Sequence, residues 1–230
     1  MIGIFDSGVG GFNAYYEVRK ALLHSDIAYL ADRRHAPYGT KEKDELVRLV
    51  KNDVKRLREL GCSAILIACC TASTVYFELD EEERKISIPI ITPAAKKAAD
   101  GARIAVIATD ATVRSHSFRE EISRYSAEAS ITEIPAQALV GMIERGARYK
   151  NLSLSDEKTL CNVCEEIKAH SPDTLVLGCT HFSHLEEEFR HRLTGVRIIS
   201  PAREGARELI RRYKEKNLHL PHESGKTVYL

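Results

Sequence analysis

The sequence has no tryptophan, only two methionines and few aromatic residues, which make up 7% of its 230 positions. No apolar run approaches the ~20 residues that a membrane-spanning helix needs. The first residues, 1–6, lack the basic region, apolar core and cleavage site of a signal peptide. The net charge of +1 argues against nucleic acid or a membrane surface as the main partner. We therefore expect a globular protein whose main partner is neither nucleic acid nor a membrane surface.

Cysteine is well represented, and the absence of an export signal favours reduced thiols over disulfides. The six cysteines are Cys62, Cys69, Cys70, Cys161, Cys164 and Cys179. Cys161 and Cys164 have the spacing of a metal or redox pair. Their surroundings, residues 156–169, form an amphipathic helical pattern with no second ligand pair nearby, so we predict no metal there.

Short apolar runs alternate with amphipathic helical patterns along the whole chain. The predicted strands cover residues 2–6, 27–31, 64–68, 86–92, 103–109, 130–134, 174–178 and 196–199, with an edge strand near Val228. The predicted helices begin near Phe12, Lys41, Thr71, Pro93, Thr112, Pro135, Asp156, Glu186 and Pro201. This alternation predicts an α/β fold with mainly parallel sheets flanked by helices.

The strand–helix pattern restarts near Gly101, which indicates two similar α/β domains. One strand and one long helix remain after the second unit, so the end of the chain is expected to return to the first. We predict a first domain of residues 1–92 plus 200–230 and a second domain of residues 93–199. The active site is expected in the cleft between them.

Two predicted strands end in the same way. The run 64–68 is followed by Cys69, Cys70 and Thr71, and the run 174–178 by Cys179, Thr180 and His181. Ligands bind beyond the carboxyl ends of strands in open α/β sheets. A single buried cysteine is often inert, but two in matched contexts indicate a paired thiol site.

Two further segments have residues suited to binding. Asp6 and Ser7 end the first strand and open the glycine-rich turn 7–11, whose backbone N–H groups favour an anion such as a carboxylate. The turn lacks both the dinucleotide-binding spacing and the P-loop lysine, so it does not predict a nucleotide site. Tyr38 and Gly39 lie in a loop with turn-forming residues, a common location for functional side chains.

A pair of thiols on opposite sides of a substrate can invert a stereocentre without a metal. One thiolate removes a proton from carbon, and the other thiol returns a proton to the opposite face. Asp6 and His181 are placed to orient or deprotonate the thiols, and Ser7, Thr71 and Thr180 to hold a carboxylate. The competing mechanism is nucleophilic attack by one cysteine with His181 as base, which leaves the repeated cysteine unexplained.

The chain resembles the aspartate/glutamate racemase family in several stretches spread over nearly its whole length. These are Ile4 to Gly11, Pro37-Tyr38-Gly39 with Lys41, Ala68-Cys69 with Thr71-Ala72-Ser73, Thr109 with Ala111-Thr112, Glu144 with Gly146, and Gly178 to His181. The chain departs from the family pattern in three places: Cys70 replaces asparagine, Ile134 replaces cysteine, and Phe182-Ser183-His184 replaces Tyr-Pro-Leu.

The resemblance implies interconversion of L- and D-glutamate without a cofactor, supplying D-glutamate for peptidoglycan in a bacterial cytoplasm. It implies that Cys69 and Cys179 are the two acid/bases, assisted by Asp6, His181 and Glu144. The substrate contacts that it implies are Asp6, Ser7, Tyr38, Gly39, Cys70, Thr71, Thr109, Thr112, Thr180 and His181. The partner is a small amino acid, with a homodimer as a further possibility. An aspartate racemase and a racemase-like binding protein with little turnover remain as alternatives.

Overall fold

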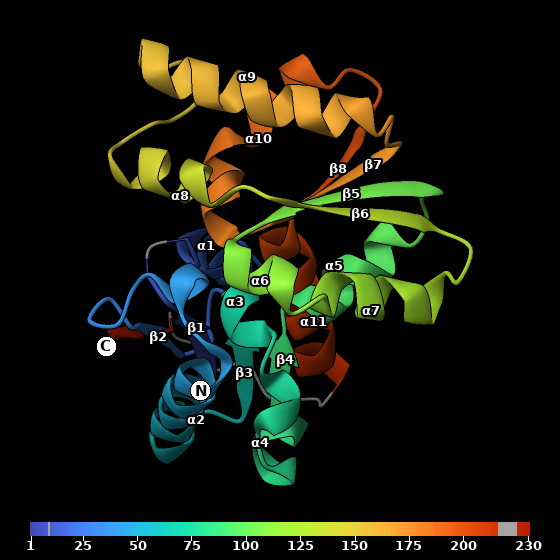
Figure 1. Ribbon diagram of the computed structural model, residues 1–230. Coiled ribbons are helices and arrows are strands. Elements are labelled where there is room, and N and C mark those ends of the chain that lie inside the picture. Colours follow the sequence, from blue (N-terminus) through green and yellow to red (C-terminus); the bar gives the residue numbers. More distant parts are fainter. Residues whose placement is uncertain (9, 216–224) are drawn as a thin grey trace.

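The computed structural model describes residues 1–8, 10–215 and 225–230, and its strands form two sheets (Figure 1). The first sheet has the order β4-β3-β1-β2-β9, with β1 (Ile2–Asp6), β2 (Ile27–Ala31), β3 (Ala64–Ile67), β4 (Ser87–Pro89) and β9 (Thr227–Tyr229). The second has the order β6-β5-β7-β8, with β5 (Arg103–Ala108), β6 (Ser130–Pro135), β7 (Thr174–Gly178) and β8 (Arg197–Ile199). Every pairing of neighbouring strands is parallel. The predicted fold class is confirmed, and the expected edge strand near Val228 is β9.

Helices connect the strands and cover both sheets. The α-helices are α1 (Phe12–Ala21), α2 (Lys43–Glu59), α3 (Cys70–Ser73), α4 (Glu81–Ile86), α5 (Ile91–Ala98), α6 (Asp110–Arg114), α7 (Ser117–Tyr125), α8 (Gln137–Glu144), α9 (Leu154–Ala169), α10 (Glu186–Arg192) and α11 (Pro201–Glu215). The described residues also form three 3₁₀ segments, which are η1 (Tyr38–Thr40), η2 (Tyr76–Glu78) and η3 (Thr180–Leu185). None of the helices in the described part of the chain combines the length and apolarity needed to cross a membrane.

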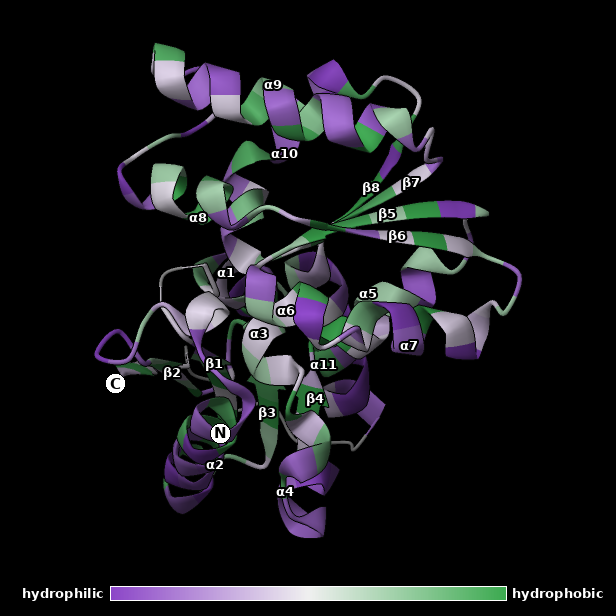
Figure 2. Cartoon of the chain, in the orientation of Figure 1, coloured by the Kyte–Doolittle hydropathy of each residue, from purple (hydrophilic) through white to green (hydrophobic). Residues whose placement is uncertain are grey.

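The inner strands β1, β3 and β7 are buried along their whole length, as expected for parallel strands covered on both faces. One apolar cluster extends from the first sheet to the second and includes Leu66, Val106 and Ala206. Two further clusters fill the space under α2 and under the α8–α10 layer. Hydrophobic residues accordingly concentrate on the strands and the inner helix faces, whereas the outer faces of α2 and α9 are polar (Figure 2). The continuous cluster holds the two sheets together as one packed structure.

Two helices lie between the sheets. Helix α11 packs against α1, α5 and β3, so the end of the chain returns to the first sheet. Helix α5 packs against α7 and α11 and also contacts β7. Because α5 contacts elements of both units, the predicted boundaries at residues 92/93 and 199/200 stay a prediction.

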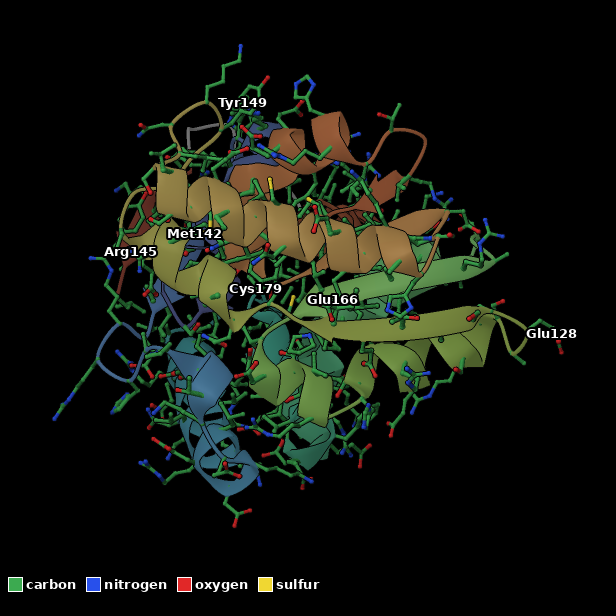
Figure 3. The ribbon with its side chains drawn as sticks, turned by 45° about the horizontal axis from the view of Figure 1, so that its top comes forward. Glu128, Met142, Arg145, Tyr149, Glu166 and Cys179 are labelled. Atoms are coloured by element: carbon green, nitrogen blue, oxygen red, sulfur yellow. The ribbon has the colours of Figure 1, made fainter. Side chains whose placement is uncertain are left out.

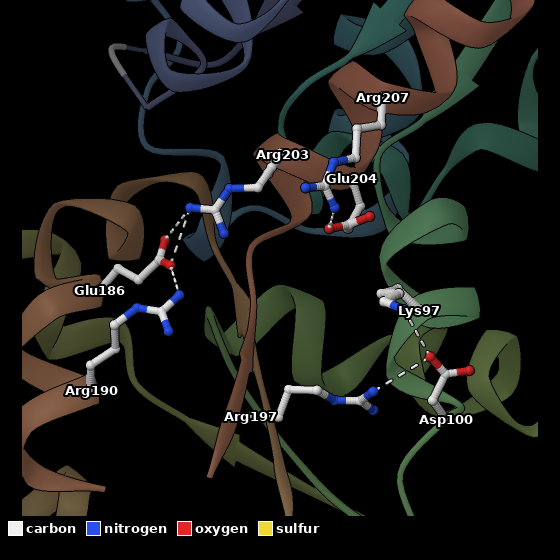
Figure 4. A network of polar contacts seen from close by, with 8 residues as sticks. All are labelled: Lys97, Asp100, Glu186, Arg190, Arg197, Arg203, Glu204 and Arg207. Carbon is white, nitrogen blue, oxygen red and sulfur yellow. Dashed lines mark hydrogen bonds and ion pairs between the residues drawn. The ribbon is translucent and has the colours of Figure 1, made fainter. Parts of the chain in front are cut away.

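Charged residues form a rim along this junction (Figure 4). Arg203 on α11 reaches Glu186 on α10 at 3.2 Å, and Arg197 on β8 reaches Asp100 at 3.4 Å. These arginines are partly exposed, and ion pairs of this kind contribute about 0–1 kcal/mol each. The apolar cluster therefore provides most of the stabilisation at the junction, and the ion pairs help to define its orientation.

Three predicted elements differ from the structure. Strand 86–92 is shorter than expected, and α5 begins at Ile91 rather than at Pro93. Proline is tolerated in a first helical turn, where its missing N–H has no intrahelical partner in any case. The helix expected to begin near Thr112 is instead two helices, α6 and α7, which are separated at His116; its φ of 51° is left-handed and interrupts the helical hydrogen bonds.

Candidate active site

The carboxyl ends of four strands, two from each sheet, surround one cavity. Its volume is about 360 Å³. Most of the residues proposed from the sequence line it: Ser7, Tyr38, Gly39, Cys69, Cys70, Thr71, Thr109, Glu144, Cys179, Thr180 and His181. Figure 3 shows Cys179 in the interior between the two halves of the molecule, with Arg145 and Tyr149 on the outside. The topology thus brings residues far apart in sequence to a common site.

Cys69 follows β3 and forms the N-cap of α3. Its Sγ accepts a hydrogen bond from the backbone N–H of Ala72 at 3.4 Å and lies 3.4 Å from Ser7 Oγ. Burial raises the pKa of the Cys69 thiol to about 11, and the nearby Asp6 carboxylate contributes to the increase. The resting thiol is therefore protonated at neutral pH.

Cys179 follows β7 and belongs to the other unit. Its Sγ lies 3.7 Å from His181 Nδ1, and His181 Nε2 lies 3.7 Å from Glu144 Oε1. Burial raises the pKa of the Cys179 thiol even further, whereas the backbone N–H of His181 opposes the increase. Glu144 is about half exposed, so this series of groups connects the buried sulfur with solvent.

Asp6 is fully buried and lies behind the cavity wall rather than in it. One of its carboxylate oxygens accepts the backbone N–H of Gly8 at 2.8 Å, and the other accepts the hydroxyl of Thr180 at 3.3 Å. The Thr180 bond joins the end of β1 to the start of η3. Asp6 therefore connects the two units and places a negative charge close to both thiols.

Three threonine hydroxyls form a closed group across the junction. Thr71 Oγ1 lies 2.9 Å from Thr109 Oγ1 and 3.1 Å from Thr112 Oγ1, and the latter two oxygens are 2.9 Å apart. Thr71 and Thr109 reach the cavity, whereas Thr112 lies behind them. Each hydroxyl already has partners, which fixes its orientation before any ligand arrives.

Tyr38 and Gly39 line the cavity beside the start of α8. The Tyr38 hydroxyl donates to Asp32 at 2.6 Å and to Asp53 at 3.2 Å, so its ring rather than its hydroxyl is available to a ligand. A Cβ atom on Gly39 would lie 2.7 Å from both Thr109 Cβ and Gln137 Oε1. Only glycine allows this close approach.

The sequence did not single out several cavity residues, including Arg33, Gln137, Val140, Ile143 and Arg148. Arg33 lies in the loop that we considered functional, but nothing in the loop pattern distinguished it from its neighbours. Arg148 Nη1 donates to the carbonyls of Ile143 and Ala147 at 2.7 Å each, which holds its guanidinium near the end of α8. Two arginines give the cavity positive charge suited to carboxylates.

Cys70 also lines the cavity and is almost fully buried. Burial raises the pKa of its thiol well above the ordinary value, and the neighbouring thiols Cys179 and Cys69 contribute. Cys70 is therefore a neutral, weakly polar wall residue.

Elsewhere, Cys161 Sγ lies 3.4 Å from Arg192 Nη1 on the outer layer. Within the described residues, no three His, Cys, Asp or Glu side chains are grouped so that they could hold a metal ion.

Comparison with known proteins agrees with this geometry. The model of the Asp/Glu/Hydantoin racemase family matches residues 22–209. The chain belongs to this family. Glutamate racemase of Aquifex aeolicus is 34% identical to it, over 90% of this chain and 81% of the relative. That of Campylobacter curvus is 35% identical, over 99% of this chain and 87% of the relative.

The solved structures point in the same direction. Glutamate racemase from Francisella tularensis in complex with D-glutamate aligns with a TM-score of 0.91 and 26% identity, over 99% of this chain and 86% of the other. The resemblance drawn from the sequence motifs is thus confirmed, and so is the predicted class of two parallel sheets flanked by helices.

The pKa of Cys69 gives a direct test of the site's electrostatics. Because only the thiolate reacts with iodoacetamide, modification of Cys69 in the ligand-free protein should rise about tenfold per pH unit and continue to rise to pH 10. In the denatured chain the same rise should level off near pH 8.5. Peptide mass spectrometry after timed reaction measures both rates. A plateau below pH 9 in the folded protein would contradict the effect of burial.

Proposed function

We propose that this chain is a glutamate racemase that inverts Cα by proton transfer between Cys69 and Cys179. The observation that supports this most strongly is that both sulfurs reach one cavity from the ends of β3 and β7, which belong to different sheets. A substrate held between the two sheets would present opposite faces of Cα to the two thiols. A single nucleophilic cysteine would not require this arrangement.

In the proposed reaction, every proton and electron pair is accounted for by the substrate and the residues of the site. One sulfur, as thiolate, takes the proton from Cα, and the electron pair of the C–H bond remains on the substrate. The other sulfur, as thiol, gives its proton to the opposite face and becomes a thiolate. The protein is then ready for the reverse reaction. His181, close to Cys179 and to Glu144, can accept or return the thiol proton, and Ser7 can orient Cys69.

Substrate binding must counteract the raised thiol pKa values. A bound ammonium group close to the sulfurs favours the thiolate, because opposite charges within a few ångströms lower a thiol pKa. Arg33 and Arg148 suit the two carboxylates of an acidic amino acid. The cytoplasm, the supply of D-glutamate for peptidoglycan and a homodimer are part of this proposal and stay predictions.

The test is isotope exchange in heavy water. Incubation with L-glutamate should introduce deuterium at Cα, which NMR measures, and should reduce the optical rotation to zero, which polarimetry measures. D-glutamate should give the same end point. If neither enantiomer exchanges at any pH from 6 to 10, the proposal is wrong. Exchange with aspartate alone would assign the alternative substrate, and calorimetric binding of glutamate without exchange would indicate a binding protein.

A further inference from the structure

Two buried carboxyl groups meet at one tyrosine hydroxyl behind the cavity wall. Asp32 follows β2 and Asp53 lies on α2, and the two residues are only 8% and 2% exposed. The hydroxyl oxygen of Tyr38 lies 2.6 Å from an oxygen of Asp32 and 3.2 Å from an oxygen of Asp53. Two carboxylates this close together in a buried place disfavour each other's ionisation. The arrangement therefore raises the question of where its protons lie.

The group is short of protons if both carboxyl groups are ionised. A hydroxyl has one proton and donates it to one carboxylate at a time, whereas ionised carboxylates only accept. The shorter contact favours Asp32, whose two oxygens also lie 2.8 Å from His35 Nδ1. The contact with Asp53 is a full hydrogen bond at the same time when the Asp53 carboxyl carries a proton and donates it to the tyrosine oxygen.

The groups around Asp53 favour this assignment. Burial raises the pKa of the Asp53 carboxyl, and the Asp32 carboxylate contributes to the increase. Arg56 opposes the increase, but its guanidinium is about half exposed and contacts the other oxygen of Asp53, at 3.2 Å. Asp32 and Tyr38 face Asp53 from the loop, and His35 reaches it only through Asp32. The neutral carboxyl therefore fits this environment better than a second negative charge.

The loop held by these contacts forms part of the cavity. It contributes Arg33, Pro37, Tyr38 and Gly39 to the cavity lining. Gly39 packs directly against Thr109 of the second unit, so the position of the loop determines the width of the cavity. The two proposed acid/bases, Cys69 and Cys179, lie on other segments. A displaced loop should therefore affect how substrate is held more than the proton transfer itself.

We propose that Asp53 is a positioning residue that donates a hydrogen bond from its neutral carboxyl group to Tyr38 and so holds the loop against the substrate cavity. Loss of that proton places a second negative charge beside Asp32, which loosens the loop and weakens substrate binding. The effect falls on KM rather than on kcat. This inference rests on the proposed function, because glutamate is the substrate with which KM is measured.

Substitutions at Asp53 separate the neutral form from the ionised form. Asp53→Asn keeps a donor toward Tyr38 and an acceptor toward Arg56 but cannot ionise, so it represents the neutral carboxyl at every pH. Asp53→Ala removes both groups. Asp44→Asn and Asp44→Ala are the matched controls, because Asp44 is exposed in the first turn of the same helix. Steady-state kinetics with glutamate from pH 5 to 9 measures KM and kcat, and scanning calorimetry measures the melting temperature without ligand.

The ratio of the wild-type KM to that of the Asn variant should rise with pH, because only the wild-type carboxyl can lose its proton. The ratio removes the contribution of the thiols, which titrate alike in both proteins. At pH 6 the Ala variant should have a KM about two- to tenfold above that of the Asn variant, the loss of one hydrogen bond. Its kcat should change by less than about twofold, and the Asp44 variants should match wild type.

The melting temperatures give a readout that needs no substrate. A carboxyl group whose pKa is raised in the folded state contributes stability at low pH, and this is lost as pH rises from the unfolded value, about 4, through the folded one. The Asn variant has no such loss. Its melting temperature should therefore exceed that of wild type by an amount that grows from pH 5 upward.

A KM ratio that does not rise with pH would overturn the inference. An Asn variant as weak as the Ala variant would also overturn it, because the ionised carboxylate would then be the form that holds the loop. If the Ala variant does not fold, the pH dependence of the ratio still decides. If wild type neither exchanges nor racemises glutamate, the proposed function fails, whereas the melting temperatures still test the neutral carboxyl of Asp53.

Discussion

Replacing either Cys69 or Cys179 by serine is expected to abolish racemisation in both directions. In the proposed mechanism each sulfur serves one face of Cα, because inversion needs a base on one face and an acid on the other. A serine hydroxyl is too weakly acidic to become the base at working pH. Since a positioned acid or base contributes about 10²–10⁴-fold, kcat should fall at least this far in each variant. The double variant should be no worse than the single ones, because the two thiols act as a unit.

The two serine variants should differ in what they retain. With Cys69 replaced, only Cys179 can remove a proton, and it reaches one enantiomer. With Cys179 replaced, the other enantiomer is the one that exchanges. Proton NMR in heavy water, started separately from L- and D-glutamate, measures loss of the Cα signal for each variant. The preferred enantiomers should be opposite.

Three other cysteines provide matched controls for this experiment. Cys62→Ser, Cys161→Ser and Cys164→Ser make the same chemical change away from the cavity lining, and turnover should stay near wild type. Normal racemisation in either the Cys69 or the Cys179 variant would exclude the two-base mechanism. Complete loss in one with an unaffected rate in the other would indicate a single nucleophile instead.

The thiol pair could be proposed from sequence because its signal is local. An apolar run followed by a small residue and a cysteine identifies a strand end, and parallel strands bring such ends to one edge of the sheet. Cys69, Cys179 and His181 line the cavity for this reason. The same rule identified Asp6 as a residue of the strand end, but it did not reveal that the carboxylate lies one layer behind the wall.

Gln137 and Arg148 could not be proposed in this way. They lie at the start of α8 and after its end, and they reach the cavity only because the second sheet packs over the first. No spacing or turn residue in the sequence records that contact, which depends on side-chain packing between distant segments. The start of α5 was misplaced for a simpler reason, because Pro93 is compatible with several positions in a first turn.

The packing between the two units leads to a second large expected effect, at Gly10. This residue lies in the turn between β1 and α1 and faces the start of η3. A Cβ atom on Gly10 would overlap Thr180 Oγ1, would lie 2.7 Å from Thr180 Cβ and would lie 3.0 Å from the His181 backbone nitrogen. These neighbours include backbone, which cannot rotate away as a flexible side chain can. Gly10→Ala must therefore displace the turn, η3 or both.

The displacement should disconnect the halves of the site. Asp6 and Thr180, whose hydrogen bond spans 3.3 Å, would move apart, and so would the strand ends that hold Cys69 and Cys179. A misplacement of about 1 Å can reduce catalysis roughly 10²-fold, so Gly10→Ala should lower kcat/KM by about that factor or more. Gly141→Ala, where the added atom meets only the tip of Arg145 at 3.4 Å, is the control and should stay close to wild type. Steady-state kinetics, with circular dichroism to confirm folding, measures both variants. A folded Gly10→Ala protein with near-wild-type kcat/KM would show that the contact between this turn and η3 does not set the distance between the two thiols.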